Sequence, residues 1–253
     1  MSQATATGHQ AIRVSGGVRN SATRIVASTV GVLAGLLGIE HGYFETLQGN
    51  VAPGSIVISA MGPPCQASSA WNGCEPAMTI VPNFLVTGFL AIIISFIVIL
   101  WAAAFVQRKN GGLVLILVSI TLFLVGGGFA SGQVGIIAGV AGTRIQAPFT
   151  WWRAHPSVNS RRFLAMLWPS SLIAYFVWFP GEYILGYFFN EYMLSLGIVS
   201  LFFDLGLGLL AVLTGFAHDI QRQSETHQTS LMSGVSLLTT GRESGCARRD
   251  LER

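Results

Sequence analysis

Charged residues are scarce in this chain: they occupy 10% of its 253 positions, whereas soluble domains have about a quarter. Apolar residues make up 51% of the chain, and the mean hydropathy is +0.59. A water-soluble surface cannot be built from so few charges, which excludes an ordinary soluble domain. We predict an all-α polytopic transmembrane helical bundle whose first partner is the lipid bilayer.

The chain also lacks the motifs of familiar enzymes. It has no phosphate-binding loop, dinucleotide fingerprint, zinc-protease motif or hydrolase elbow. An intramembrane serine protease would need Gly-x-Ser-Gly, but Ser131 stands in Gly-Phe-Ala-Ser-Gly, which has the wrong spacing. An aspartyl intramembrane protease needs two aspartates in its spans, and Asp204 is alone at mid-span. We therefore expect a non-enzymatic protein with no catalytic residue, metal or cofactor.

Apolar runs predict about six spans. Four runs are evident, at residues 25–47, 79–105, 163–179 and 192–217. Pro180 and Gly181 follow the third of these runs and predict its end. The uncharged stretch 110–142 is broken by glycines at 126–132, so it predicts two short spans, three and four, or a re-entrant hairpin. A cleaved signal peptide is the alternative for the first run, although no small-x-small cleavage site follows it.

The positions of the basic residues predict the topology, because cytoplasmic loops accumulate Lys and Arg. If the stretch 110–142 crosses out and back, all fourteen basic residues lie inside. A single crossing would place nine of them outside. We predict a plasma-membrane protein with both termini in the cytoplasm, and the net charge of +3 therefore implies no nucleic-acid partner.

The same topology divides the chain into three parts. The transmembrane domain covers residues 24–218 and includes an outer loop at 48–78. Polar tails at 1–23 and 219–253 are predicted to be disordered. In the outer loop, Cys65 and Cys74 lie in an oxidising compartment, where they form a structural disulfide or remain free thiols.

The first span combines small and polar residues on one side. Gly31, Gly35, Gly38 and Gly42 alternate at spacings of four and three, so they form a stripe suited to helix packing. His41 and Glu45 share a face near the outer end, and Glu40 points away from it. Two interpretations stay open for them: a metal or proton site, or polar residues at the headgroup boundary.

Asp204 lies about midway along the last span, where a carboxylate costs on the order of 3 kcal/mol. It shares a stripe with Gly197, Gly208 and Gly215, which predicts a neighbouring helix at close range. Arg144, Thr121 and Tyr175 are its candidate partners. Asp204 then either anchors helix packing or relays protons.

Two functions follow from these residues. The leading hypothesis is a structural or accessory membrane component that binds a membrane-protein partner or a second copy of itself. The alternative is a transporter or channel for a small solute or ion that uses Asp204 with Glu40 and His41. A water-sized cavity that joins Asp204 to Glu40 or His41 would favour transport, whereas a dry, glycine-packed Asp204 would favour the structural role.

Overall fold

The computed structural model describes residues 21–59, 75–147 and 149–249. This part of the chain is mostly helical, as predicted, with one antiparallel pair of short strands. In chain order the elements are α1 (Ser21–Leu47), β1 (Val57–Ser59), β2 (Pro76–Met78), α2 (Phe84–Leu100), a π-helical turn that continues α2 (Trp101–Phe105), α3 (Gly111–Leu124), α4 (Phe129–Thr143), α5 (Thr150–Ala154), α6 (Val158–Phe188) and α7 (Asn190–Arg249).

Four helical segments are long and apolar enough to cross a membrane. A crossing needs about 20 apolar residues, because each helical residue advances about 1.5 Å through a hydrocarbon core of about 30 Å. Two further helices, α3 and α4, are apolar but shorter. The four long segments are Ser21–Leu47, Phe84–Phe105, Val158–Phe188 and Asn190–Thr226. They support membrane association of the chain.

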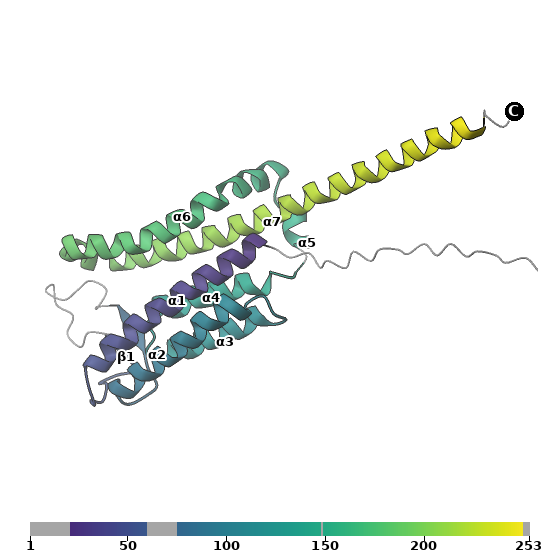
Figure 1. The fold of residues 1–253 in the computed structure, drawn as a ribbon. Helices are drawn as coiled ribbons and strands as arrows, with labels where there is room; N and C mark the ends of the chain where they lie inside the picture. Colours follow the sequence, from purple (N-terminus) through teal and green to yellow (C-terminus); the bar gives the residue numbers. More distant parts are fainter. Residues whose placement is uncertain (1–20, 60–74, 148, 250–253) are drawn as a thin grey trace, which may run out of the picture.

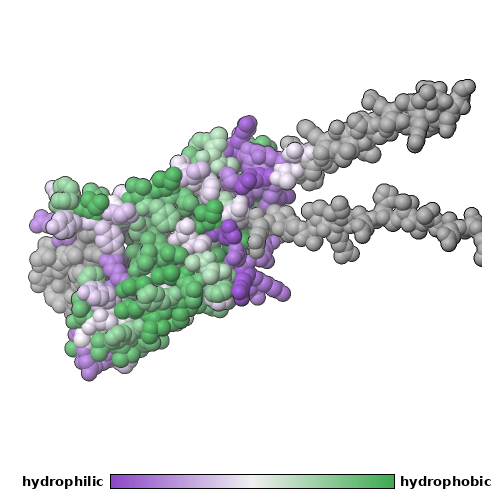
Figure 2. All heavy atoms as spheres, viewed as in Figure 1, coloured by the Kyte–Doolittle hydropathy of each residue, from purple (hydrophilic) through white to green (hydrophobic). Residues whose placement is uncertain are grey.

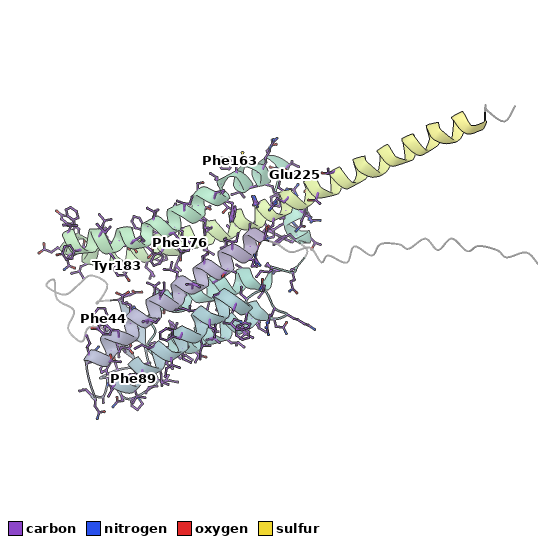
Figure 3. All side chains as sticks on the ribbon, in the orientation of Figure 1. Phe44, Phe89, Phe163, Phe176, Tyr183 and Glu225 are labelled. Atoms are coloured by element: carbon purple, nitrogen blue, oxygen red, sulfur yellow. The ribbon has the colours of Figure 1, made fainter. Side chains whose placement is uncertain are left out.

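The helices form two groups that lie side by side (Figure 1). In the first, α1 packs extensively on α2 and α4, and α3 packs on α4; we call this the α1–α4 group. In the second, α6 and α7 pack along each other as the α6–α7 pair. The pair meets the α1–α4 group mainly where α7 contacts α1 and α4, and this interface is smaller than those within the groups. Phe89 of α2 and Phe163 of α6 lie on outer faces of the two groups (Figure 3).

Glycines allow α1 to approach its neighbours closely. A Cβ added to Gly35 would lie 2.5 Å from Cγ1 of Ile99, and one added to Gly42 would lie 2.7 Å from the carbonyl oxygen of Gly88. In lipid, helices associate through such close packing rather than through hydrophobicity. All four glycines of the predicted stripe are confined in this way: Gly31, Gly35, Gly38 and Gly42.

The turn between α3 and α4 is held against the β1–β2 strands. The backbone N–H of Gly126 donates to the carbonyl oxygen of Met78 at 2.9 Å. Gly126 and Gly128 have φ of +91° and +89°, a left-handed region that glycine tolerates best. We call this end of the molecule the hairpin end. Since α2 begins there and α3 returns there, α3 and α4 extend between the same two ends as α2.

Polar contacts join the helix termini at the opposite end. The carboxylate of Asp219 in α7 accepts hydrogen bonds from the backbone N–H groups of Ala22 and Thr23 at 3.0 and 2.8 Å, and so caps α1. Nearby, Arg24 donates to the side chain of Gln107 at 2.9 Å. Figure 2 shows hydrophilic residues gathered at this end, beside a broad hydrophobic band. We call it the basic end, and it includes Arg24, Arg108, Lys109, Arg144, Arg153, Arg161 and Arg162.

Helix α6 does not end at Pro180, and the predicted boundary at residues 180–181 is wrong. The helix continues to Phe188, with Pro169 and Pro180 inside it. Proline removes a backbone donor, but a spanning helix tolerates it where neighbouring groups satisfy the freed carbonyl. Glu182 consequently belongs to a buried helical face and not to a loop.

Helix α7 is longer than the last predicted span. It continues to Arg249, through residues 219–249 of the segment for which we predicted disorder. Its final part projects away from both helix groups (Figure 1). Residues 1–20 of the predicted N-terminal tail lie outside the described residues.

Candidate functional site

Asp204 lies on the face of α7 that meets α6. Its side chain is nearly buried, with 7% of the residue exposed. Oδ1 accepts a hydrogen bond from the indole Nε1 of Trp178 at 2.7 Å. Its carboxyl group also lies near that of Glu182, and both residues line the same cavity. Both partners come from α6, so the close neighbour that we predicted for Asp204 is this helix.

Glu182 is a second acid in this position, and we did not single it out from the sequence. It is 2% exposed, and its carboxylate accepts a hydrogen bond from the hydroxyl of Ser200. Ser200 and Asp204 are four residues apart on α7, so both face Glu182. The one signal in the sequence is the spacing of Trp178 and Glu182, which are also four apart. The expected helix end at Pro180 concealed that signal.

Tyr175 lies deeper along the same interface. It is fully buried, and its hydroxyl has no hydrogen-bond partner in the part of the chain that the structure describes. The hydroxyl oxygen would be 3.7 Å from a Cβ added to Gly208, which is one turn along α7 from Asp204. Further toward the basic end, the hydroxyls of Ser171 and Thr214 are hydrogen-bonded at 2.8 Å. The interface between α6 and α7 is therefore closely packed on the basic-end side of Tyr175.

A cavity of about 290 Å³ lies between the α1–α4 group and the α6–α7 pair. Asp204 and Glu182 line it, and Glu75 lines it from the strand side. Its walls are otherwise mainly apolar and include Phe129 and Phe179. None of its lining residues, all within the described ranges, is Lys or Arg. Its volume is near the lower limit of ligand pockets, about 300 Å³.

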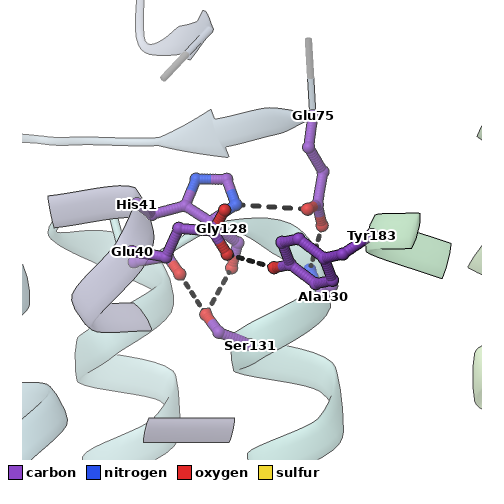
Figure 4. Close-up of polar contacts among 8 residues, drawn as sticks. Glu40, His41, Glu75, Gly128, Ala130, Ser131 and Tyr183 are labelled. Carbon is purple, nitrogen blue, oxygen red and sulfur yellow. Dashed lines mark hydrogen bonds and ion pairs between the residues drawn. The ribbon is translucent and has the colours of Figure 1, made fainter. Parts of the chain in front are cut away.

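Two of the predicted polar residues, His41 and Glu40, each form a polar contact with a residue that lines the cavity (Figure 4). His41 Nε2 lies 3.2 Å from Oε2 of Glu75, whose Oε1 accepts from the backbone N–H of Ala130 at 3.1 Å. On the other side, the hydroxyl of Tyr183 donates to Glu40. Tyr183 and Glu75 both line the cavity. Glu40 and His41 therefore do not line the cavity that Asp204 lines, but each contacts a residue that does.

Glu45 lies apart from the cavity, under the α3–α4 turn. It is 0% exposed, and a Cβ added to Gly126 would lie 2.4 Å from either carboxylate oxygen. Neither oxygen, nor Nδ1 of His41, has a hydrogen-bond partner among the described residues. The described residues also contain no group of three His, Cys, Asp or Glu side chains arranged to hold a metal ion. The metal interpretation of His41 and Glu45 therefore gains no support here.

Other predicted partners of Asp204 lie elsewhere. Arg144 is exposed at the C-terminal cap of α4, at the basic end. Thr121 donates to the carbonyl oxygen of Leu117 at 3.0 Å within its own helix. Only Tyr175, among the three candidates, belongs to the helix that faces Asp204.

The three glycines predicted to share the face of Asp204 divide into two kinds. Added Cβ atoms on Gly208 and Gly215 would contact Tyr175 and Trp168 at 3.5 and 3.3 Å, so these two glycines face α6. Gly197 has open space beside it and lines the cavity.

Cys65 and Cys74 lie outside the described residues, and their disulfide stays a prediction.

No family model, curated protein or solved structure matches this chain. A function must accordingly be argued from the geometry and chemistry of the site itself.

Glu75 should hold the strand segment to two helices. We expect Glu75→Ala to accelerate backbone hydrogen exchange in β2 and in the first turn of α4. The variant leaves both ring nitrogens of His41 without a partner among the described residues, and an unpaired buried group costs about 1 to 3 kcal/mol. Mass spectrometry of the detergent-solubilised protein measures the exchange. Glu191→Ala, an exposed acid in the first turn of α7, is the control. Equal exchange in both variants would show that the Glu75 contacts do not hold this region.

Proposed function

We propose that the protein moves a small cationic solute or ion across the membrane, and that the cavity is its binding site. The supporting observation is an open volume of about 290 Å³ whose charged lining residues, within the described ranges, are Glu75, Glu182 and Asp204. Ionisable residues at a cavity within the spans commonly mark substrate or ion routes. A dry Asp204 packed by glycine would instead have favoured a structural role.

The cavity forms one half of the proposed route. Asp204 lies about 16 Å along α7 from Met193, another lining residue nearer the hairpin end, at 1.5 Å per residue. Between Asp204 and the basic end, the hydrogen bond of Ser171 with Thr214 leaves no open path between α6 and α7. Passage to the basic end requires movement, and the smaller interface between the pair and the α1–α4 group is the place for it. Such rocking of one helix group against another is the usual basis of alternating access.

We further propose six spans, with the basic end at the cytoplasmic face of the plasma membrane. Helices α3 and α4 have 14 and 15 residues, or about 21 and 22 Å at 1.5 Å per residue, and connect the same ends as α2. Local bilayer thinning accommodates spans of this length. Both termini lie on the cytoplasmic side in this arrangement, since Asp219 caps the start of α1.

An accessory role is the second candidate, and the length of α7 favours it. The helix projects beyond both groups as far as Arg249 (Figure 1). Helices obtain most of their stability from packing, so a projecting helix suits contact with a partner protein or a second copy. The transport test below separates the two candidates.

The charge of Asp204 should control ion movement through the reconstituted protein. In proteoliposomes on a solid-supported membrane, we expect concentration jumps of H⁺, Na⁺, K⁺ or benzylammonium to produce a protein-dependent current with at least one of them. Asp204→Asn should lower that current by about tenfold, because the attraction for the cation is lost. Asn retains an acceptor for the Nε1 hydrogen of Trp178, so the fold should persist.

Glu191→Gln is the matched control, because Glu191 is an exposed acid near the same end of α7. Its current should equal that of the wild type. If the wild type gives no more current than protein-free liposomes, or if Asp204→Asn conducts like the wild type, transport through this cavity is wrong and the accessory role is favoured.

The six-span topology predicts which residues are accessible from outside the cell. In a variant with all three native cysteines replaced by serine, Ser55→Cys should react with a membrane-impermeant maleimide in intact cells. Ser160→Cys should react only after permeabilisation, because it lies at the basic end. Both positions are exposed in the structure. Labelling of Ser160→Cys in intact cells would reverse the proposed orientation.

A further inference from the structure

The cavity contains two chemically different regions. At its deep end, the carboxyl groups of Glu182 and Asp204 face each other between α6 and α7. Its walls are apolar and are formed by α1, α4, α6 and α7; they include Leu37, Phe129, Phe179 and Ile198. A ligand that fits both regions must have a positive group at one end and a hydrocarbon body at the other.

A bare divalent metal ion does not fit this arrangement. Ca²⁺ takes six to eight oxygen ligands, and Mg²⁺ needs near-ideal octahedral geometry. The described residues contain no group of three His, Cys, Asp or Glu side chains that would hold a metal. Glu75, the third acid of the cavity, already contacts His41 and the backbone N–H of Ala130. The mainly apolar walls supply few further oxygen atoms.

An ammonium group fits better, because it presents three N–H donors and no acceptor. The deep end offers carboxylate oxygens on Glu182 and Asp204. Ser200 also lines the cavity, and its hydroxyl oxygen, which donates to Glu182, can accept a further N–H.

The aromatic rings add a second preference for this class of ligand. Phe129 and Phe179 line the cavity from α4 and α6. Aromatic rings and apolar walls favour a hydrocarbon body over bulk water. A hydrated inorganic ion gains nothing from such walls. The volume of about 290 Å³ suits a compact organic molecule.

We propose that the ligand of this cavity is a small primary ammonium compound with an apolar body. Its ammonium group lies between Glu182 and Asp204, and its hydrocarbon part contacts Phe129 and Phe179. This inference rests on the proposed function, since it takes the cavity as the solute site and names the class of solute.

Radiolabelled benzylamine is the probe for this assignment. Scintillation proximity measures its equilibrium binding to the purified full-length protein in detergent. We expect saturable binding that unlabelled benzylamine displaces. Benzyl alcohol has nearly the same shape but no charge, and should need about a hundredfold higher concentration to displace the probe, since a buried charge pair contributes several kcal/mol.

Two variants locate the ammonium group. Asp204→Asn and Glu182→Gln keep the size of the side chains and should each weaken benzylamine binding by about tenfold or more, since each removes one carboxylate partner. Glu191→Gln should bind within about twofold of the wild type, because exposed substitutions have small effects. The melting temperature of each variant checks that the loss of binding is not a loss of fold.

The outcomes separate this inference from the transport proposal. The inference is overturned if benzyl alcohol competes as well as benzylamine, or if folded Asp204→Asn and Glu182→Gln proteins both bind normally. Ion currents that depend on Asp204, without benzylamine binding, would overturn the ligand class and leave transport intact. Benzylamine binding without any protein-dependent current would leave the ligand class intact and overturn transport.

Discussion

Two carboxyl groups, Glu182 and Asp204, face each other between apolar helices without a basic residue beside them among the cavity-lining residues. Apolar surroundings do not tolerate isolated charges, so these groups need hydrogen-bond donors or a cation. Trp178 and Ser200 supply donors from α6 and α7. The cavity has room for a further hydrogen-bond donor beside them. Both acids are thus held by hydrogen bonds that cross the interface between α6 and α7.

Charge is also separated along the length of the molecule. Many of the cations in the described ranges gather at the basic end, while Glu40, Glu45 and Glu75 lie toward the hairpin end. The cavity extends from this acidic side toward Asp204. On the proposed route, a cation would meet carboxylates first and the cationic end would repel it. Such a field raises the local concentration of cations at the mouth of a cleft.

Much of the architecture could be predicted from local features of the sequence. Apolar run length indicated the long helices, and glycine spacing on the first span indicated its packing face. Glu182 could not be predicted as a neighbour of Asp204, because Pro180 marks a helix end by local rules and tertiary contacts carried α6 beyond it. Glu75 was missed for a related reason. Its position depends on contacts with α1 and α4, which are far apart from it in the sequence.

Water access to the deep cavity tests the central claim most directly. Gly197 lines the cavity and has open space for a side chain, so Gly197→Cys in a chain with its other cysteines replaced by serine reports on that volume. We expect a cationic methanethiosulfonate, applied from the hairpin side, to modify this thiol much faster than an anionic one. Gly206→Cys, on an exposed face of α7, provides the lipid-side reference. Failure of both reagents at Gly197→Cys, or faster reaction of the anionic one, would contradict an open acidic cavity.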